Sequence, residues 1–235
     1  MDKETKKGVI ILLSIFISLM LILGTEAWLR NTNKFVYQES LDEVALRVDE
    51  REIPLRELSY YVYVVETEID KQARIYNPED PLDYWNTYFN SGVKGGYISE
   101  MAKDAVLGSC VCDLIYEAMA KEQGYQLTEG EKKEASQEAE ELFDALTEEQ
   151  KQTTGLSLEI LQETEERKAL VLKFASEYFE DVDFTGYSGY REDLVSYAGD
   201  YYKEQILSQH SVWYNKAITG EMDVGRVTTG YVARY

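Results

Sequence analysis

The stretch from Tyr97 to Glu131 constrains the fold of this chain more than any other part of the sequence. It predicts one long helix that ends at Gly124, because glycine adopts the left-handed C-terminal cap without a Cβ penalty. Thr128 and Glu131 have the spacing of a capping box, in which the two side chains bind free backbone amides of the next helix. The stretch therefore predicts a central helix followed by a sharp reversal.

The helix expected before Gly124 has a wide apolar surface. At about 100° per residue, one arc carries mainly apolar side chains: Met101, Ala105, Cys112, Ile115, Tyr116 and Met119. The opposite arc mixes charged with apolar side chains: Glu100, Asp104, Asp113, Glu117 and Lys121, with Val106, Leu107, Cys110, Leu114 and Ala118 among them. An apolar surface wider than one stripe indicates a helix that is contacted from several sides.

The two cysteines of the chain, Cys110 and Cys112, lie on this helix. Their side chains point about 200° apart, so they cannot form a disulfide with each other. Their spacing is not that of a CxxC redox or zinc motif. We interpret them as small apolar side chains, with Cys112 in the core, and expect no disulfide framework.

The composition excludes several classes of partner. The chain has 44 acidic and 24 basic residues, a net charge of −20, which repels nucleic acid and anionic lipid headgroups. Hydrophobic residues make up 44% of the chain, enough to form a core. About 190 residues follow the N-terminal apolar segment, enough for one large or two small domains.

Residues 8–29 are expected to form a transmembrane helix. Val9–Leu23 carries no charge and has Ser14 and Ser18 as its only polar residues. With the flanking residues, the segment reaches the ~20 residues that span a bilayer. The lysines before it place residues 1–7 in the cytoplasm and the body outside the cell membrane.

A cleaved signal peptide is the alternative, because Thr25-Glu26-Ala27 is an acceptable cleavage site after Ala27. The body would then be secreted. No cysteine follows the apolar run directly, so a lipoprotein signal is not expected. In both cases the remaining residues work outside the cytoplasm, after a polar spacer at residues 30–43.

Three short segments predict a small β element. Val44–Val48 alternates apolar and polar residues, Asp49 and Glu50 form a turn, and the chain returns as a short strand to Ile53. Met222–Val232 is expected to be a terminal strand that pairs with Val44–Val48.

Further helices are expected on both sides of the central one. The first opens at Pro54, which is favourable at a helix start, and runs to about Ile75. The second covers Glu131 to Leu146 and is followed by a second capping box at Thr147-Glu148-Glu149-Gln150. Ser157 is expected to cap the next helix, which continues to about Tyr178.

The C-terminal half contains a charged run and a break. We interpret the charged residues from Glu163 to Lys168 as a solvated helix face. The break falls at Asp181–Gly189, which contains two glycines. One last long helix is then expected, with a stripe from Leu194 to Ala217 and an end at Gly220.

The order of these segments resembles the N-terminal chaperone domain of the SurA and PrsA foldases. The phrases that carry the resemblance are VALRVDEREI, LIYEAMAKEQGYQLTEGE and TTGLSLEILQETEERKALVLKFASEYF. The similarity covers residues 44 to about 180 and extends to the final helix and strand. It implies a mainly α fold: a multi-helix module at 44–235 with a small β element from the N-terminal hairpin and the C-terminal strand, preceded by one transmembrane helix.

The resemblance also implies a function. Members of the family work outside the cytoplasm and bind unfolded polypeptides, and many carry a parvulin prolyl isomerase domain inserted before the last helix. Here the insertion point corresponds to residues 181–192, which is far shorter than the ~50 residues of a domain. The resemblance thus implies the chaperone module without the isomerase, with unfolded exported polypeptides as partners.

Aromatic residues are the candidates for peptide binding. The chain has 19 tyrosines, whose side chains combine a large contact area with a polar tip. The candidate residues are Tyr84, Trp85, Tyr88, Phe89, Tyr97, Tyr201 and Trp213. The alternative for the segment Pro81–Phe89 is a short amphipathic helix whose Trp85 and Phe89 fill the core.

The sequence offers little for catalysis. No Ser-His-Asp, Cys-His, HExxH, phosphate-loop or dinucleotide motif is present, and we expect no catalytic residue, metal or cofactor. Acid–base chemistry would depend on the single histidine, His210, or on a pair of carboxylates. We interpret His210, which lies between Ile206 and Trp213, as a hydrogen-bonded structural residue.

Three hypotheses for the function remain open from the sequence. The first is a membrane-anchored chaperone that binds extended segments of exported proteins without covalent chemistry. The second is an assembly scaffold that serves one dedicated envelope partner. The third is a peptidyl-prolyl cis-trans isomerase. A homodimer is a further arrangement that the sequence leaves open.

Overall fold

The computed structural model describes residues 35–90 and 95–230. Residues 8–29, where a transmembrane helix is expected, lie outside these ranges. Among the described residues, no helix is both long and apolar enough to cross a membrane. Residues from Tyr37 onward form one compact unit, which is mainly helical.

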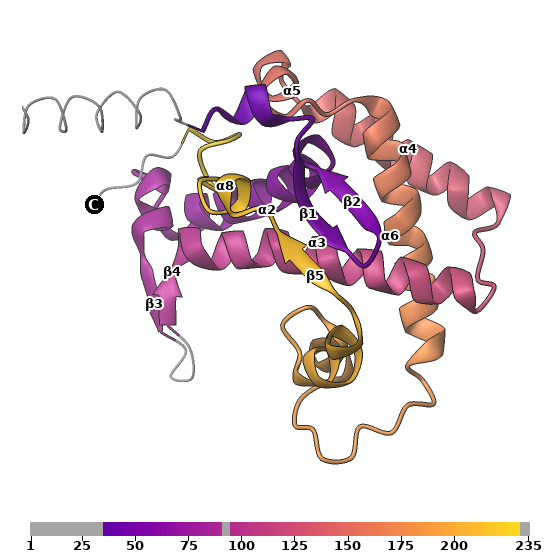
Figure 1. Ribbon diagram of the computed structural model, residues 1–235. Coiled ribbons are helices and arrows are strands. Elements are labelled where there is room, and N and C mark those ends of the chain that lie inside the picture. The colour runs from indigo at the N-terminus through magenta and orange to yellow at the C-terminus, as the bar shows by residue number, and fades with distance from the viewer. Residues whose placement is uncertain (1–34, 91–94, 231–235) are drawn as a thin grey trace, which may run out of the picture. The chain divides into compact units, whose positions relative to one another are not determined.

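The central helix is α3, Ile98–Glu122 (Figure 1). It contacts α2, Leu55–Tyr76, and α6, Leu158–Tyr178, as well as strand β1. Most of its buried residues lie between Val106 and Ala120, so the expected contact from several sides is confirmed. Gly124 has φ 81°, and Thr128 and Glu131 exchange both capping hydrogen bonds. The predicted helix end and reversal are therefore correct.

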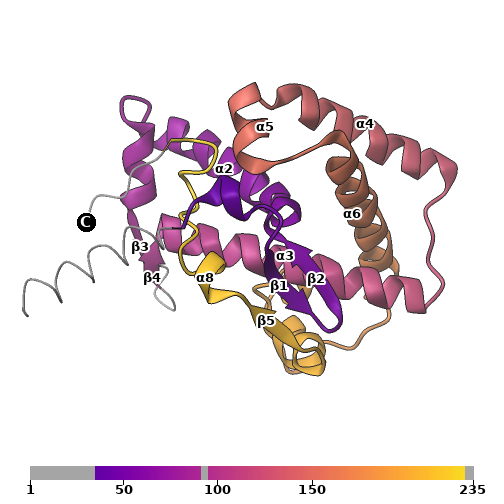
Figure 2. The same ribbon diagram turned by 45° about the horizontal axis from the view of Figure 1, so that its top comes forward.

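A three-stranded antiparallel sheet lies beside the helices (Figure 2). Its strands are β1, Val44–Val48, β2, Arg51–Pro54, and β5, Val212–Tyr214, in the order β2-β1-β5. Val48 pairs with Arg51 across the hairpin turn, where Asp49 has φ 52°. The hairpin prediction is confirmed.

The predicted partner strand was wrong. Val212–Tyr214 pairs with β1, and Met222–Gly230 forms no strand. Val212, Trp213 and Tyr214 are β-branched or aromatic, which suits a strand. The amides of Gly225, Val227 and Thr228 instead donate hydrogen bonds to the Glu66 carboxylate of α2.

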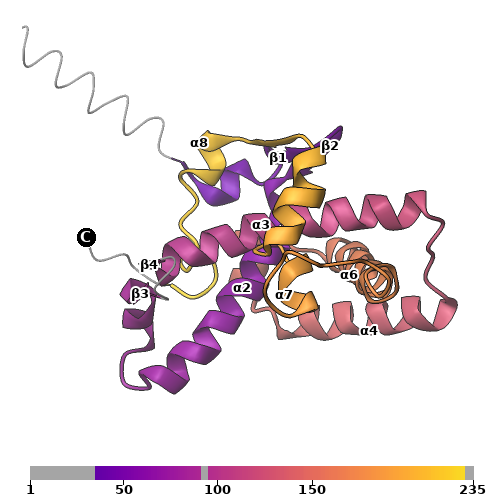
Figure 3. The same cartoon turned by 90° about the horizontal axis from the view of Figure 1, so that it is seen from below.

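The next helices after α3 are α4, Glu129–Ala145, α5, Glu148–Thr154, and α6. The expected caps are all present: Thr147 accepts a hydrogen bond from the Gln150 amide, and Ser157 accepts one from the Ile160 amide. Helix α4 packs mainly against α6. Figure 3 shows α6, seen nearly end-on, next to α4.

The long C-terminal helix expected from Leu194 to Ala217 is not formed. The chain makes short elements instead: α7, Arg191–Val195, the π-helical turn η3, Tyr202–Ile206, the 3₁₀ turn η4, Leu207–Gln209, β5, and α8, Lys216–Thr219. Two features break the helix. First, the chain makes a tight turn in which the Gly199 amide donates to the Ser196 carbonyl at 2.9 Å, and a Cβ at Gly199 would collide with the Leu194 backbone there. Second, Asp49 in the hairpin turn is hydrogen-bonded to His210 and Ser211.

The segment between α2 and α3 contains a turn and a small hairpin. The 3₁₀ turn η2 covers Pro81–Asn86, and strands β3, Tyr88–Asn90, and β4, Gly95–Tyr97, pair antiparallel. The sequence predicted a short helix here but not the strands. On the other side of the unit, the 3₁₀ turn η1, Tyr37–Ser40, packs on the body, so this part of the expected spacer is folded.

Candidate functional site

The β3–β4 hairpin is held in place by its two flanking helical elements. Trp85 in η2 is fully buried in the core, and η2 contacts both α2 and α3. The Thr87 carbonyl accepts a 3.1 Å hydrogen bond from the Ile98 amide, which fixes the hairpin to the first turn of α3. Within the hairpin, Tyr88 pairs with Tyr97. A buried tryptophan and a helix start thus present the hairpin from a fixed base.

Large apolar side chains on this hairpin are exposed. Tyr88, Phe89 and Tyr97 are 57%, 50% and 48% exposed, and Met101 in α3 is 44% exposed. The rings of Tyr88 and Tyr97 meet edge to face with centroids 5.4 Å apart. Successive side chains of a strand point to opposite faces, so Tyr88 and Tyr97 lie on one face of the hairpin and Phe89, which pairs with Gly96, on the other. We call these three residues and Met101 together the aromatic surface.

Two glycines shape the aromatic surface. A Cβ on Gly95 would overlap the ring of Tyr88, so the ring lies directly on the strand backbone. A Cβ on Gly96 would come within 3.6 Å of the Met101 side chain. The glycines thus let the exposed side chains lie close to the backbone of β4.

More exposed apolar side chains lie on the elements next to the aromatic surface. Ile75 and Tyr76 at the end of α2 and Leu82 in η2 are exposed. Seven of the twelve exposed large apolar residues among the described ones therefore belong to the segment from Ile75 to Met101. Apolar exposure concentrated in this way is typical of an interaction site.

The remaining candidates from the sequence lie elsewhere. Tyr84 is half-buried and packs against Tyr76, with ring centroids 5.2 Å apart. Trp85 belongs to the core, as the alternative interpretation of Pro81–Phe89 held, whereas Phe89 does not. Of the candidates, Tyr88, Phe89 and Tyr97 belong to the aromatic surface, with Phe89 on the hairpin face opposite to the two tyrosines. Met101, which the helical wheel placed on the main apolar arc, is exposed beside Gly96 of β4, whereas Ile98 and Ala102 near it in α3 are buried.

Tyr201 and Trp213 are separate from this surface. Tyr201 packs into a second group of rings with Phe184 and Tyr187, at centroid distances of 4.7 and 5.3 Å. Trp213 lies on β5, and the guanidinium of Arg47 sits 5.5 Å from its ring centroid. The structure therefore does not combine all seven candidates into one site.

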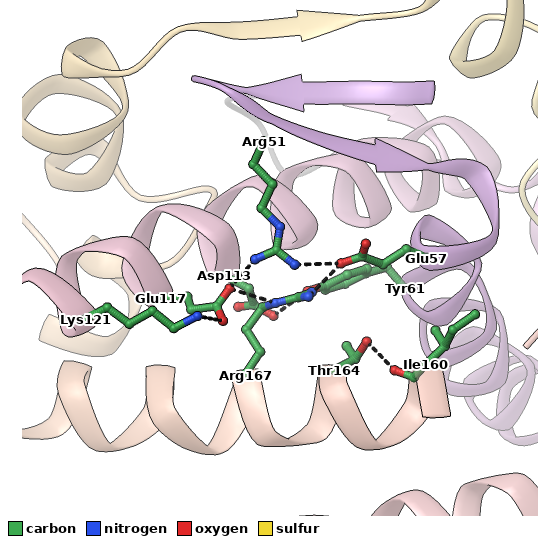
Figure 4. A network of polar contacts seen from close by, with 9 residues as sticks. All are labelled: Arg51, Glu57, Tyr61, Asp113, Glu117, Lys121, Ile160, Thr164 and Arg167. Carbon is green, nitrogen blue, oxygen red and sulfur yellow. Dashed lines mark hydrogen bonds and ion pairs between the residues drawn. The ribbon is translucent and has the colours of Figure 1, made fainter. Parts of the chain in front are cut away.

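A network of charged side chains joins β2, α2, α3 and α6, as Figure 4 shows. Arg167 of α6 is almost fully buried and donates to Glu57 at 2.6 Å and to Glu117 at 3.0 Å. Arg51 bridges the same two carboxylates, and Lys121 donates to Glu117 at 2.6 Å. The network thus ties three helices and the hairpin together.

Two carboxylates near Arg167 titrate differently. Burial acts to raise the pKa of the Glu117 carboxyl, but the Lys121 hydrogen bond and the charges of Arg167 and Arg51 outweigh it and hold this pKa below its usual value. Asp113 accepts a 3.0 Å hydrogen bond from the Tyr61 hydroxyl, and burial raises its pKa to about 6. The difference follows from the cations, because three of them bind Glu117 directly.

An open cleft of about 690 Å³ lies above this network. Arg51, Glu117 and Arg167 form part of its lining, together with residues of the α3–α4 turn. All the basic side chains that line it, Arg51, Lys121, Lys132 and Arg167, already pair with glutamates of this chain. We therefore interpret the network as a structural lock between helices.

The sequence did not predict the buried network, because charged residues usually lie on the solvated face of a helix. Thr164, Glu165 and Arg167 are buried, so the charged run in α6 is not simply a solvated face, and Glu117 is buried although it lies on the polar arc of α3. Helical spacing contains the signal. Leu161, Thr164 and Arg167 continue at three-residue steps towards Val171 and Phe174, which places the polar residues on the apolar stripe.

The groups most suited to catalysis are engaged or buried. The Nδ1 of His210 lies 2.7 Å from the Asp49 carboxylate, whose other oxygen accepts a hydrogen bond from the Ser211 amide. His210 is thus hydrogen-bonded as expected, but in the strand connection and not in a helix. Both cysteines are free and buried, and burial raises the pKa of each thiol. In residues 35–90 and 95–230, no group of three or more His, Cys, Asp or Glu side chains is placed to hold a metal ion.

Comparison with known proteins adds no relative. The chain matches no protein family, no curated protein and no solved structure.

Proposed function

We propose that this protein is a membrane-anchored chaperone that works outside the cytoplasm and binds extended segments of unfolded exported polypeptides. The observation that carries the proposal is the aromatic surface on the β3–β4 hairpin. Its side chains are large, exposed and held on a fixed base, as binding of apolar segments without covalent chemistry requires. The resemblance to the SurA and PrsA chaperone module supports the same function.

The charge of the chain supports this role. A net charge of −20 keeps a complex with an aggregation-prone client soluble and attracts basic segments. The four residues of the aromatic surface are neutral, and the neighbouring Glu100 carboxylate accepts a 3.2 Å hydrogen bond from the Tyr97 amide. Apolar contact and long-range charge thus act on the same client without opposing each other.

A direct test is suppression of aggregation by the full chain in lipid nanodiscs. A denatured client is diluted with and without the chain, and light scattering is recorded. We expect suppression by the native chain and its loss in the double variant Tyr88→Ser, Phe89→Ser. The matched control is Leu172→Ser, Tyr190→Ser, which removes one aliphatic and one aromatic side chain that are 68% and 79% exposed elsewhere.

The outcome separates the proposal from its alternatives. Equal suppression by both double variants would refute a role for the aromatic surface, and no suppression by the native chain would refute the chaperone. Crosslinking in native membranes then distinguishes a scaffold, which would give one stoichiometric partner, from a chaperone, which would give many substoichiometric ones. A self-adduct would identify a homodimer.

A further inference from the structure

The three-stranded sheet has two edges that differ in chemistry. The strand order β2-β1-β5 places β2 at one edge and β5 at the other, and no further strand of the described chain pairs with either (Figure 1). Strand β2 contains Arg51 and Glu52 and ends at Pro54, whereas β5, Val212–Tyr214, has neither a charge nor a proline. Charged residues and proline keep edge strands from pairing with other chains, so β5 is the unprotected edge.

The residues on both sides of β5 are hydrogen-bonded to β1 and its turn. The Asp49 amide donates to the Ser211 carbonyl at 2.7 Å, and the Asn215 amide donates to the Ala45 carbonyl at 2.9 Å. In an antiparallel ladder, residues whose backbone groups face the partner alternate with residues whose groups face away. Trp213, midway between Ser211 and Asn215, is therefore the residue of β5 whose backbone groups face β1.

The backbone groups of Val212 and Tyr214 consequently point away from β1. No hydrogen bond joins their N–H and C=O groups to another described residue, and both residues are at least partly exposed. Unpaired donors and acceptors that repeat every two residues match those of a second extended chain. The outer edge of β5 thus has the chemistry by which peptides add a strand to an existing sheet.

The two faces of the sheet present different side chains at this edge. Trp213 pairs with Arg47 on the outer face and is 47% exposed. Tyr214 pairs with the fully buried Leu46, so it lies on the face towards the helices, and it is 37% exposed. Side chains of neighbouring strands interact in pairs on each face. An added strand would place one residue beside Trp213 and the next residue beside Tyr214.

An acidic side chain of α3 lies close to Tyr214. Burial raises the pKa of the Tyr214 hydroxyl, and Cys110 and Asp104 of α3 raise it further. Asp104 is exposed and forms no ion pair within the described parts of the chain. It follows Met101 of the aromatic surface by three residues, so the two lie on the same side of α3. A basic residue next to Tyr214 would therefore meet a carboxylate of opposite charge.

We propose that the outer edge of β5 is a second polypeptide-binding site, which takes an extended client segment as a fourth strand of the sheet. The preferred segment has an apolar residue beside Trp213 and an adjacent lysine or arginine beside Tyr214 and Asp104. The inference deepens the proposed function and rests on it, because it states how an extended client is held and which sequence is preferred. Met101 lies one helical turn from Asp104, so the same client can also reach the aromatic surface.

Hydrogen exchange in the full chain in nanodiscs tests the edge residue by residue. The probe is the blocked peptide Thr-Val-Lys-Val-Lys-Val-Thr, in which valines on one face alternate with lysines on the other. We expect the Val212 and Tyr214 amides to exchange freely without peptide and to slow by about fivefold or more when it is bound. The Trp213 amide should be protected in both states. Absence of peptide binding, or unchanged exchange of the Val212 and Tyr214 amides, would overturn the proposal.

Two substitutions test the contacts by fluorescence anisotropy of the labelled peptide. Val212→Pro removes an amide that faces away from β1, a position where a sheet tolerates proline, and should weaken binding by about fivefold or more. Val212→Thr keeps the amide and the branched shape, so it is the matched control and should bind as the native chain does. Asp104→Asn should weaken binding by about twofold to fivefold, and should have no effect on a peptide with glutamine in place of lysine. Equal affinities of Val212→Pro and Val212→Thr would overturn the proposal.

Modified peptides test the same contacts on the native chain, and so stay decisive if Val212→Pro does not fold. Lysines on the face of Val212 and Tyr214 turn their own amides towards β5, whereas the valines turn theirs away. N-methylation of both lysine amides should therefore abolish binding, and N-methylation of the valine amides should preserve it. The opposite result, or equal binding of the two peptides, would contradict the added strand.

The edge site and the proposed function fail in different ways. The double variant Tyr88→Ser, Phe89→Ser should lose suppression of client aggregation but still show peptide protection of the Val212 and Tyr214 amides. If the peptide does not protect these amides while aggregation still depends on the aromatic surface, the edge site fails alone. If the peptide protects them but the native chain suppresses no aggregation, the chaperone fails and the edge remains a peptide-binding site.

Discussion

Substitution of Arg167 by methionine tests the structural lock between the helices. Arg167 is 3% exposed and donates to both Glu57 and Glu117. Methionine keeps much of the side-chain volume but leaves the two carboxylates with fewer partners. Removing one member of a buried ion pair costs about 3 to 5 kcal/mol of unfolding free energy.

The expected loss lies at the lower end of that range. Arg51 still bridges both carboxylates, and Lys121 still binds Glu117, so neither charge is left unpaired. We therefore expect Arg167→Met to lower the unfolding free energy by about 3 kcal/mol. Since domains are stable by about 5 to 15 kcal/mol, the variant should fold but unfold at clearly lower denaturant concentration.

The measurement is urea unfolding of the full chain in nanodiscs, followed by circular dichroism and tryptophan emission. Arg191→Met is the matched control, because Arg191 is exposed and, among the residues that the structure describes, forms an ion pair only with Glu192 at 3.6 Å. It should change stability by no more than about 0.5 kcal/mol. Adding Glu57→Gln and Glu117→Gln to Arg167→Met should recover part of the loss, since the remaining groups are no longer buried anions. A loss below about 1 kcal/mol for Arg167→Met would refute the lock.

Three further substitutions have defined outcomes. Asp113→Asn should stabilise the protein at pH 7 by up to about 3 kcal/mol. The reason is that the pKa of Asp113 in the folded state is raised from 3.8 to about 6, so ionisation of this carboxyl opposes folding. In denaturation curves the gain should shrink as the pH falls from about 6 to about 4 and vanish below about pH 4. Trp85→Ala should cost about 3 to 5 kcal/mol in the same unfolding assay, because it empties a fully buried site, and a cost near zero would contradict the burial of this ring. His210→Ala should leave the rate of a proline-limited peptide isomerisation assay unchanged, whereas a rate above background that this substitution abolishes would establish the isomerase hypothesis.

Local signals in the sequence predicted the elements that local chemistry determines. Gly124 ends α3, and Thr128, Thr147 and Ser157 cap the helices that follow. Each of these features depends on residues within one turn of helix, so the sequence contains the whole cause. The Val44–Ile53 hairpin was predictable for the same reason.

Features that depend on distant residues were not predictable in this way. The helical stripe from Leu194 to Ala217 continues in the sequence, but the tertiary contact between Asp49 and His210 ends it and frees Val212–Tyr214 to pair with β1. The burial of Arg167 requires glutamates from two other helices. Periodicity indicates which helix face is buried, but it does not identify the ion-pair partner that a buried charged side chain needs.

The binding role of the candidate residues stays a prediction, and only their exposure can be compared with the sequence. Tyr88, Phe89 and Tyr97 are exposed on the β3–β4 hairpin, with Phe89 on the face opposite to the two tyrosines. Exposure itself could not be inferred, because Trp85 is fully buried only three residues before Tyr88. The missing information was the β3–β4 pairing, which carries Tyr88 and Phe89 away from the core.

Site-directed photocrosslinking tests most directly whether the aromatic surface binds clients. The full chain in nanodiscs carries the substitution Phe89→p-benzoylphenylalanine or, as control, Leu172→p-benzoylphenylalanine, and a purified denatured client is added before illumination. The account predicts a client adduct from position 89, competed by excess unlabelled client, and little or none from position 172, although Leu172 is the more exposed residue. Equal adducts from both positions, or none from position 89, would contradict it.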